Sequence, residues 1–231
     1  NREKIKELAS GQLKDEANAW FVGEPFKVFY DYKKEGIWQL GEEAAAAANG
    51  QEPGDIKVQD VDGNGVITTD DRIIYSQRPD VTFGFNNTFN YKGFDLSVFL
   101  YARLGQWIAY DYNTTYRINA LENGGNVDYW TPENPTNAFP RPNKSKSYTQ
   151  VTYYSTLKYE DGSFFKIRDI TLGYTFKPEL LKHLNLSRLR VYATAKNFFT
   201  FSKIDNYDPE QGGSISFPMT KQLVFGLNVE F

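Results

Sequence analysis

The stretch that decides the fold is VTFGFNNTFNYKGFDLSVFLYARL, residues 81–104, in which apolar and polar side chains alternate. Residues 81–91 and residues 94–104 each place their apolar side chains on one face. A period of two is typical of a β-strand with one apolar face. Lys92 and Gly93 separate the two runs, and so short a connection favours a tight hairpin. The sequence therefore predicts two antiparallel strands joined at Lys92-Gly93.

Three further segments show the same alternation, the second of them more loosely: SFFKIRDITLGYTFK at 163–177, SRLRVYATAKNFFTF at 187–201 and KQLVFGLNVEF at 221–231. The five predicted strands are about 11 to 15 residues long, whereas strands of globular proteins usually have about 5 to 6. A strand that crosses a bilayer at a tilt needs about 9 to 11 residues. Strand length therefore favours a membrane barrel.

The connections between these strands alternate in length. Two are short, at 92–93 and 178–186, and two are long, at 105–162 and 202–220. Outer-membrane barrels have short turns on one side and long loops on the other. A soluble β-sandwich has the same period of two, but aromatic residues near the strand ends suit the interfacial girdles of a barrel. These residues are Tyr91, Phe94, Tyr174, Phe176, Phe199, Phe201 and Phe231.

Composition narrows the protein class. The net charge of −3 over 231 residues argues against a nucleic-acid partner. There is no cysteine, so disulfides, thiolate metal sites and cysteine catalysis are excluded for this sequence. The sequence contains no run of about 18 apolar residues, so it predicts no transmembrane helix. The sequence opens with Asn1 inside a charged run, from which we expect that the true beginning of the protein is missing.

The segment DVDGNGVITTDD, residues 60–71, has the spacing of an EF-hand-type calcium loop, with glycine at the sixth position. The twelfth position holds aspartate rather than the longer glutamate, and no flanking helices are evident. An ion-free turn is the alternative, because Asp, Asn and Gly favour turns by themselves. We expect a structural Ca²⁺ rather than a sensor. The candidate ligands are Asp60, Asp62, Asn64, the carbonyl of Val66, Thr68 and Asp71.

The long loops are rich in aromatic and polar residues, as binding surfaces for sugars or proteins are. Trp38, Trp107, Trp130 and Arg141 are the candidates for contact with a substrate or partner. The alternative is that these side chains pack the loops together. Evidence for an enzyme is absent from the sequence: the only histidine, His183, falls in a predicted turn, and no nucleophile or phosphate-binding motif occurs.

Six motifs in order resemble the C-terminal part of the SusC/RagA-type TonB-dependent outer-membrane transporters of Bacteroidetes. They are GDIKVQDVDGNGVITTDDR (54–72), PDVTFGFNNTFNYKGFDLSVFL (79–100), YWTPENPTNAFPRP (129–142), EDGSFFKIRDITLGYTF (160–176), LRVYATAKNFFTF (189–201) and FGLNVEF (225–231). A series of this length is more specific than any single motif.

The resemblance implies an all-β fold: the C-terminal portion of a large antiparallel transmembrane β-barrel of about 22 strands with long extracellular loops. Residues 1–80 would form an extracellular loop region with the calcium-type loop, and residues 81–231 the last barrel strands and their loops. The segment Trp20–Leu40 would be either a barrel strand or an extracellular extension. In the family the last strand ends in the periplasm, which places the long loops outside and the short turns inside. The plug that fills such barrels does not occur in this sequence.

For function, the resemblance implies import of an oligosaccharide or peptide across the bacterial outer membrane. TonB, acting through the missing N-terminal region, and a SusD-like surface lipoprotein would be the partners, and outer-membrane lipid the surroundings. Alternating apolar residues before a terminal Phe also resemble the signal for outer-membrane assembly: Phe225, Leu227, Val229 and Phe231. The alternative function is a secreted, calcium-stabilised β-rich adhesin or glycan-binding module.

Overall fold

The computed structural model describes residues 3–119 and 124–231, and it divides into two compact units. A sheet unit comprises Pro79–Gln106, Gly162–Gln211 and Ser216–Phe231. A loop unit comprises the residues up to Arg78, Trp107–Asp161 and Gly212–Ile215. The predicted division at residue 80 differs from this arrangement, because residues 107–161 pack with the N-terminal residues although they follow a strand of the sheet in sequence.

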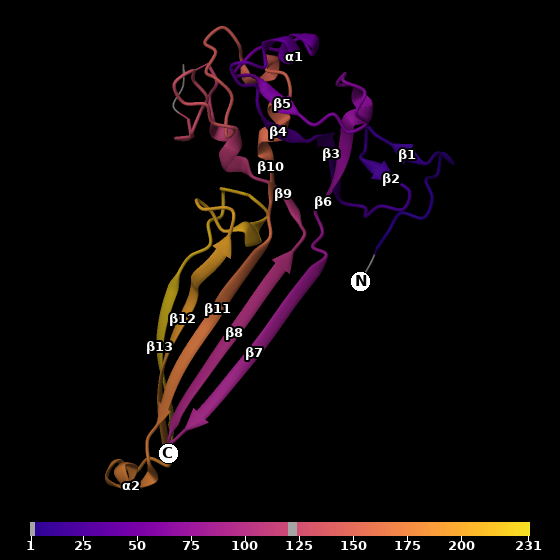
Figure 1. Cartoon of the computed structure of the whole chain (residues 1–231). Helices are drawn as coiled ribbons and strands as arrows, with labels where there is room; N and C mark the ends of the chain where they lie inside the picture. Colours follow the sequence, from indigo (N-terminus) through magenta and orange to yellow (C-terminus); the bar gives the residue numbers. More distant parts are fainter. Residues whose placement is uncertain (1–2, 120–123) are drawn as a thin grey trace. The chain divides into compact units, whose positions relative to one another are not determined.

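The sheet unit is built on five antiparallel strands that lie side by side in the order β13-β12-β11-β8-β7 (Figure 1). Each strand of this sheet pairs with the next of the five in sequence. Among the described residues, β7 and β13 pair on one side only. The sheet is therefore open at both edges in the described part of the chain, whereas a closed barrel has no edge strands. The strands are β7 (Val81–Tyr91), β8 (Phe94–Leu104), β11 (Phe164–Thr175), β12 (Arg188–Ser202) and β13 (Gln222–Glu230).

All five predicted strands are confirmed, with ends within two residues of those expected from the alternation. The hairpin between β7 and β8 turns at Lys92 and Gly93, whose φ angles of 47° and 90° are both positive. Positive φ at both central residues defines the turn type whose twist matches that of paired strands. The regular elements of the described residues are mostly strands, and the helices are few and short, which confirms the all-β class.

One face of the sheet is apolar and exposed. Large side chains on it remain 46–78% exposed, which is uncommon for a water-soluble domain. Strands of 11 residues span about 36 Å, or about 25 Å when tilted by 45°, which is the height of the lipid-facing band of an outer-membrane barrel. The residues are Phe83, Phe85, Phe89, Phe94, Leu104, Leu172, Phe199, Phe201, Leu223, Phe225 and Leu227.

Two irregularities lie within the sheet, and the one in β11 resets the alternation of that strand. The register of β11 shifts at Arg168, between Ile167 and Asp169, against both neighbouring strands. Asn197 in β12 has a φ of 57°, at the position where β12 passes this shift. A bulge adds a residue to one strand and bends it locally. As a result Phe165 and Ile167, at odd-numbered positions, share the apolar face with Ile170, at an even-numbered position.

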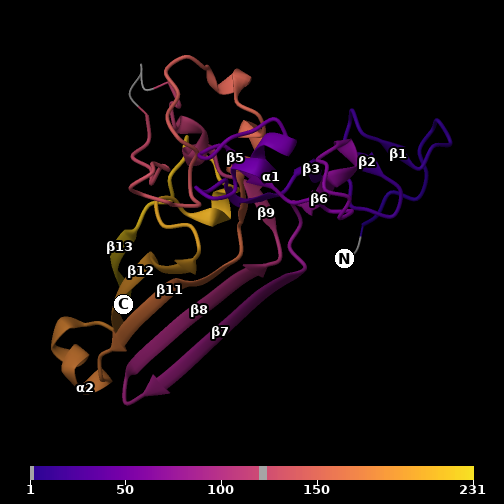
Figure 2. The ribbon, with the colours of Figure 1, turned by 45° about the horizontal axis from the view of Figure 1, so that its top comes forward.

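The connection between β11 and β12 contains the short helix α2 (Pro178–Leu181) and the 3₁₀ turn η5 (Lys182–Leu184). Leu181 is buried and His183 is exposed, as expected for a turn. The hairpin turn, α2 and the C-terminus lie at one end of the sheet (Figures 1 and 2). No helix in the described part of the chain is long and apolar enough to cross a membrane.

The loop unit contains short paired strands and single helical turns. Its elements are β1 (Lys14–Asp15), β2 (Trp20–Phe21), β3 (Val28–Tyr32), β4 (Lys34–Ile37), α1 (Glu43–Ala48), β5 (Ile56–Val58), η1 (Thr69–Asp71), β6 (Arg72–Ser76), β9 (Trp107–Ala109), η2 (Asp111–Thr115), η3 (Tyr148–Gln150), η4 (Tyr154–Lys158) and β10 (Tyr159–Asp161). Strand β3 pairs with β6 in a two-stranded sheet and does not join the five-stranded one. The segment Trp20–Leu40 is therefore an extension of the loop unit.

The core of the loop unit joins residues far apart in sequence. Its buried centre consists of Ile37, Ile56, Val58, Trp130 and Leu157, which come from β4, β5, the proline-rich segment 129–142 and η4. Because apolar burial supplies most of the stability of a small unit, this contact holds the proline-rich segment against the N-terminal strands.

Candidate functional site

The calcium-type loop brings three carboxylates together. Oxygen atoms of Asp60, Asp62 and Asp71 lie within 4.8 Å of one another. Ca²⁺ binds oxygen at about 2.3–2.6 Å, so two ligands of one ion are at most about 5 Å apart. The three aspartates therefore have the spacing that a calcium ion requires.

Backbone hydrogen bonds shape this loop. Asp71 is buried: its Oδ1 accepts from the backbone N–H of Val61 at 2.8 Å and its Oδ2 from that of Thr68 at 2.7 Å. Asp60 accepts from the N–H groups of Gly63 and Gly65, both at 2.7 Å. The hydrogen bond from Thr68 contributes most to lowering the pKa of Asp71 below its ordinary value. The loop thus keeps its twelfth position charged and directed inward.

The other predicted ligands take part in turns. Asn64 donates from Nδ2 to Asp62 and accepts at Oδ1 from the backbone N–H of Val66 at 2.8 Å. The Thr68 hydroxyl caps η1 by accepting from the backbone N–H of Asp70 at 3.2 Å. Hydrogen bonds of this kind also occur in ion-free turns. The arrangement suits calcium, and it leaves the ion-free turn open.

Two of the predicted contact residues lie in the core. Trp38 and Trp130 are 8% and 5% exposed, and each indole N–H is satisfied internally, by Gln51 at 3.0 Å and by Gln39 at 2.8 Å. Buried tryptophans usually find such a partner. Neither ring offers a surface for a substrate or partner, so the structure assigns both to loop packing, contrary to the contact prediction.

The other two contact residues also have internal partners. Trp107 packs against the ring of Tyr75, with centroids 4.7 Å apart. Arg141 bonds to Glu52, and its Nε lies 3.3 Å from Asp55. The structure does not bring the four predicted residues together into one surface.

An ionic cluster that the sequence analysis did not single out lies on the polar face of the sheet. Lys166 of β11 is fully buried, and its ammonium lies 2.7 Å from both Asp208 and Glu210. Glu210 also pairs with Arg168 at 3.1 Å, and Asp208 accepts from the hydroxyl of Thr200 at 3.3 Å. A lysine in an alternating strand predicts only that its side chain lies on the polar face, so sequence pattern alone does not reveal its acidic partners.

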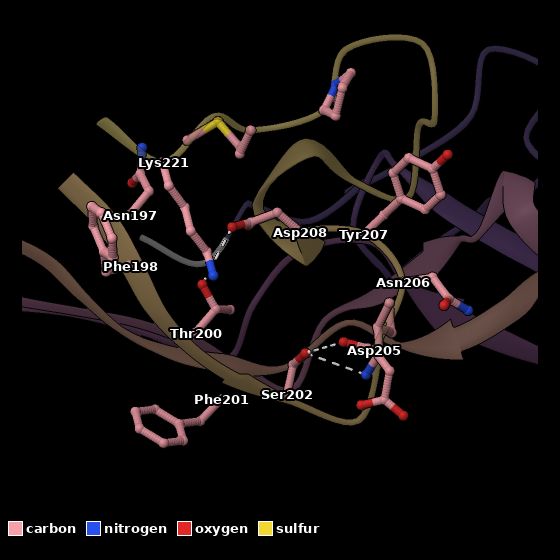
Figure 3. Close-up of a pocket in the computed structure, with 13 residues that line it drawn as sticks. Asn197, Phe198, Thr200, Phe201, Ser202, Asp205, Asn206, Tyr207, Asp208 and Lys221 are labelled. Atoms are coloured by element: carbon pink, nitrogen blue, oxygen red, sulfur yellow. Dashed lines mark hydrogen bonds between the residues drawn. The ribbon is translucent and has the colours of Figure 1, made fainter. Parts of the chain in front are cut away.

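A cavity of about 710 Å³ lies beside this cluster (Figure 3). Its walls come from the end of β12 and from the connection between β12 and β13. Polar and aromatic side chains line it, among them Thr200, Asp205, Asn206, Tyr207 and Asp208. The cavity lies entirely within the sheet unit.

Comparison with known proteins gives consistent relatives, although no family model matches the chain. The chain is 31% identical to TonB-dependent receptor P3 and 32% identical to TonB-dependent receptor P26, both of Formosa agariphila, over 90% and 91% of its length. It is 31% identical to TonB-dependent receptor SusC of Bacteroides thetaiotaomicron over 74% of its length. These alignments cover 22%, 23% and 17% of the three relatives.

The fold agrees with these relatives. The RagAB peptide importer in its open-open state superposes with a TM-score of 0.69 at 25% identity, over 99% of this chain and 25% of the other. The RagAB peptide transporter gives a TM-score of 0.68 at 24% identity. The chain belongs to the SusC-type TonB-dependent receptors. It spans about a sixth to a quarter of the length of the relatives it matches, which agrees with the resemblance to the C-terminal part of such a receptor.

For this receptor chain, the relatives confirm the expectation of a protein that is not an enzyme, because they are receptors and transporters. The calcium-type loop is not tested by these relatives and stays a prediction.

The last strand of the receptor chain carries Phe225, Leu227 and Val229 on the apolar face, and the fourth predicted assembly residue, Phe231, directly follows that strand. Phe225, Leu227 and Phe231 are 78%, 67% and 94% exposed, and Val229 is 41% exposed. Their register partners on β12 are apolar as well, with Ala193 opposite Phe225 and Val191 opposite Leu227. The geometry agrees with the alternation that motivated the prediction, while recognition by assembly machinery stays a prediction.

Proposed function

We propose that the protein to which this chain belongs imports an oligosaccharide or peptide across the bacterial outer membrane, driven by TonB and assisted by a SusD-like surface lipoprotein. The chain would supply the last barrel strands and extracellular loops. Its relatives support the proposal: they include SusC and several TonB-dependent receptors, and the RagAB structures are of a peptide importer.

The observation that carries the proposal is the exposed apolar face of the five-stranded sheet. Its tilted height of about 25 Å suits a bilayer, and such a face would be a liability in water. The opposite face carries charged side chains, including Asp95 and Arg190, whose guanidinium bonds the carboxylate at 2.8 and 2.5 Å. Apolar outside and polar inside is the arrangement of a barrel with a polar lumen.

Two measurements on the intact protein test this function. Fractionated cells should hold the protein in the outer membrane, released only by detergent; recovery in the soluble fraction would instead favour a secreted adhesin or glycan-binding module. Deletion of the gene should abolish growth on one of a panel of polysaccharide hydrolysates or on casein hydrolysate, and a strain without TonB should show the same defect. Restoring the full-length gene is the control. Unchanged growth on every source would contradict import.

We also propose that the calcium-type loop binds a structural Ca²⁺ in the intact protein. The support is the three aspartates within one coordination distance and the low pKa of Asp71, which keeps the ligand charged. The ion would supply positive charge among three carboxylates that otherwise repel one another. It would stiffen the loop before β7.

Calcium titration of the full-length receptor tests the site. Terbium luminescence and calorimetry should report binding that the double variant Asp60→Asn/Asp62→Asn loses. Asp70→Asn is the matched control, because Asp70 is exposed beside the cluster and does not belong to it. Binding that is absent in millimolar Ca²⁺, or equal in the double variant, would favour the ion-free turn.

A further inference from the structure

The connection after β12 begins with a segment that folds back onto the sheet. We call residues 203–211 the strap. Two of its side chains are apolar and buried, Ile204 at 9% and Pro209 below 2% exposed. Asp208 and Glu210 bind Lys166, as described above, and their side chains are 13% and 9% exposed. The strap therefore has anchored positions distributed along its length rather than a single contact.

The anchor lies on the polar face of the sheet. Ile167 pairs with Leu100 of β8 and Phe199 of β12 on the apolar face, so its neighbour Lys166 points to the opposite side. Phe164 shares this side and lies under the ammonium of Lys166, with 5.5 Å between the nitrogen and the ring centroid. The strap thus covers the polar side of β11 and β12.

The geometry points to a lumenal strap: we propose that residues 203–211 are held against the lumen wall by Lys166 and narrow the transport route at this end of the sheet. That the polar face lines a lumen rests on the proposed function. Lys166 acts here as a positioning residue. The connection between β12 and β13 is then not wholly an extracellular loop, because its first part lies inside the barrel.

Charge balance explains why Lys166 sets the position of the strap. Two cations, Lys166 and Arg168, face two carboxylates, Asp208 and Glu210. A buried ammonium costs folding free energy unless it is paired with an anion. If one partner of the pair moved away, the other would be left as an unpaired buried charge, so the two are held together. Without the lysine, Arg168 alone would face two carboxylates that repel each other, and Asp208 would lose its ammonium partner, which favours release of the strap.

The strap borders the cavity of about 710 Å³, and the anchoring residue Asp208 is among the residues that line it (Figure 3). Asp205 and Asn206 also line it and are exposed, whereas Asp208 is half-buried. A molecule that passes this end of the sheet would meet these two side chains.

Hydrogen exchange of the full-length receptor in detergent micelles tests the anchor. In Lys166→Met, strap amides should exchange at least tenfold faster, while those of β13 stay unchanged. The triple variant Lys166→Met/Asp208→Asn/Glu210→Gln removes the repulsion and should restore slower exchange. Arg188→Met is the matched control, because it removes a cation from an exposed pair with Glu230 on the same sheet. Equal strap exchange in Lys166→Met and the unaltered receptor would overturn the role of Lys166.

Thiol labelling on intact cells tests the lumenal position and does not depend on a variant of Lys166. A single cysteine replaces Asn206 in a receptor without other cysteines, and Glu133→Cys in an exposed loop is the reference. N-ethylmaleimide should label both sites, whereas a 5-kDa PEG-maleimide should label position 206 at least tenfold more slowly. Equal PEG labelling at the two sites would refute the constriction. Recovery of the protein without detergent would instead refute the proposed function, and the exchange experiment would still decide what holds the strap.

Discussion

Arginine at the middle of the apolar face should destabilise the receptor far more than arginine at the edge of that face. Phe85 and Val81 of β7 are equally exposed, at 49% and 52%, so they differ in depth rather than in burial against the protein. Phe85 is the fifth of the 11 residues of β7, about 13 Å along the strand from Val81. With a 45° tilt, this places Phe85 about 9 Å deeper in a band about 25 Å high.

The magnitude follows from this depth. Arginine facing lipid costs about 2–4 kcal/mol near the bilayer midplane and about 0–1 kcal/mol near the interface. Phe85→Arg should therefore lower the folding equilibrium constant by about 30- to 700-fold, since 1.4 kcal/mol is a factor of ten. Val81→Arg should lower it by less than about tenfold. Phe85→Ala measures the loss of the ring, including its stacking on Phe83, and is subtracted.

Urea titration of the full-length receptor folded into phospholipid vesicles measures these differences from the unfolding midpoints and slopes. Asn86→Arg is the control on the polar face, where arginine meets no lipid. If Phe85→Arg, corrected for Phe85→Ala, costs no more than Val81→Arg or Asn86→Arg, the apolar face does not face a bilayer. The proposed function would then lose its main support.

Three smaller predictions concern single side chains. Gly226→Ala should cost about 1–3 kcal/mol in the same assay, because a Cβ there would collide with the ring of Tyr192; the penalty should shrink in a Tyr192→Ala background, and an unchanged penalty would contradict this packing. The lowered pKa of Asp71 stabilises the loop above the unfolded-state pKa of about 4, and that stability is lost as the pH falls through the lower folded-state pKa. Hydrogen exchange between pH 5 and 2 should therefore show acid-induced opening that Asp71→Asn lacks, and parallel curves would contradict it. Trp130→Phe leaves the Gln39 oxygen without its donor and should cost about 1–3 kcal/mol in thermal unfolding, and no change would mean that water replaces the bond.

The sheet was predictable because its information is local. Alternation along one strand specifies which side chains share a face, and the Lys92-Gly93 turn specifies the first pairing. The exception is instructive: the bulge at Arg168 moves Phe165 and Ile167 onto the apolar face, and a strict period of two does not anticipate it. Only the neighbouring strands on both sides reveal the extra residue.

The calcium-type loop was predictable for a similar reason, since its 12 residues carry both the carboxylates and the glycines that turn the backbone. The burial of two tryptophans was not predictable. Trp38 and Trp130 lie in sequence among residues that suit a binding surface, yet the hydrogen-bond partners of their indole groups lie 13 and 91 residues away. Whether an aromatic ring is a platform or a core residue depends on what covers it.

By itself, the sequence determined the five strands, their apolar face, the hairpin turn and the calcium-type spacing, because each depends on neighbours within about a dozen residues. Tertiary structure alone decided that the described residues of 107–161 pack with the N-terminal strands, that Trp38 and Trp130 are buried and that Lys166 pairs with acids 42 and 44 residues away. The physical reason is that burial and ion pairing depend on distance in space, and alternation along the chain carries no record of which distant segment will cover a given side chain.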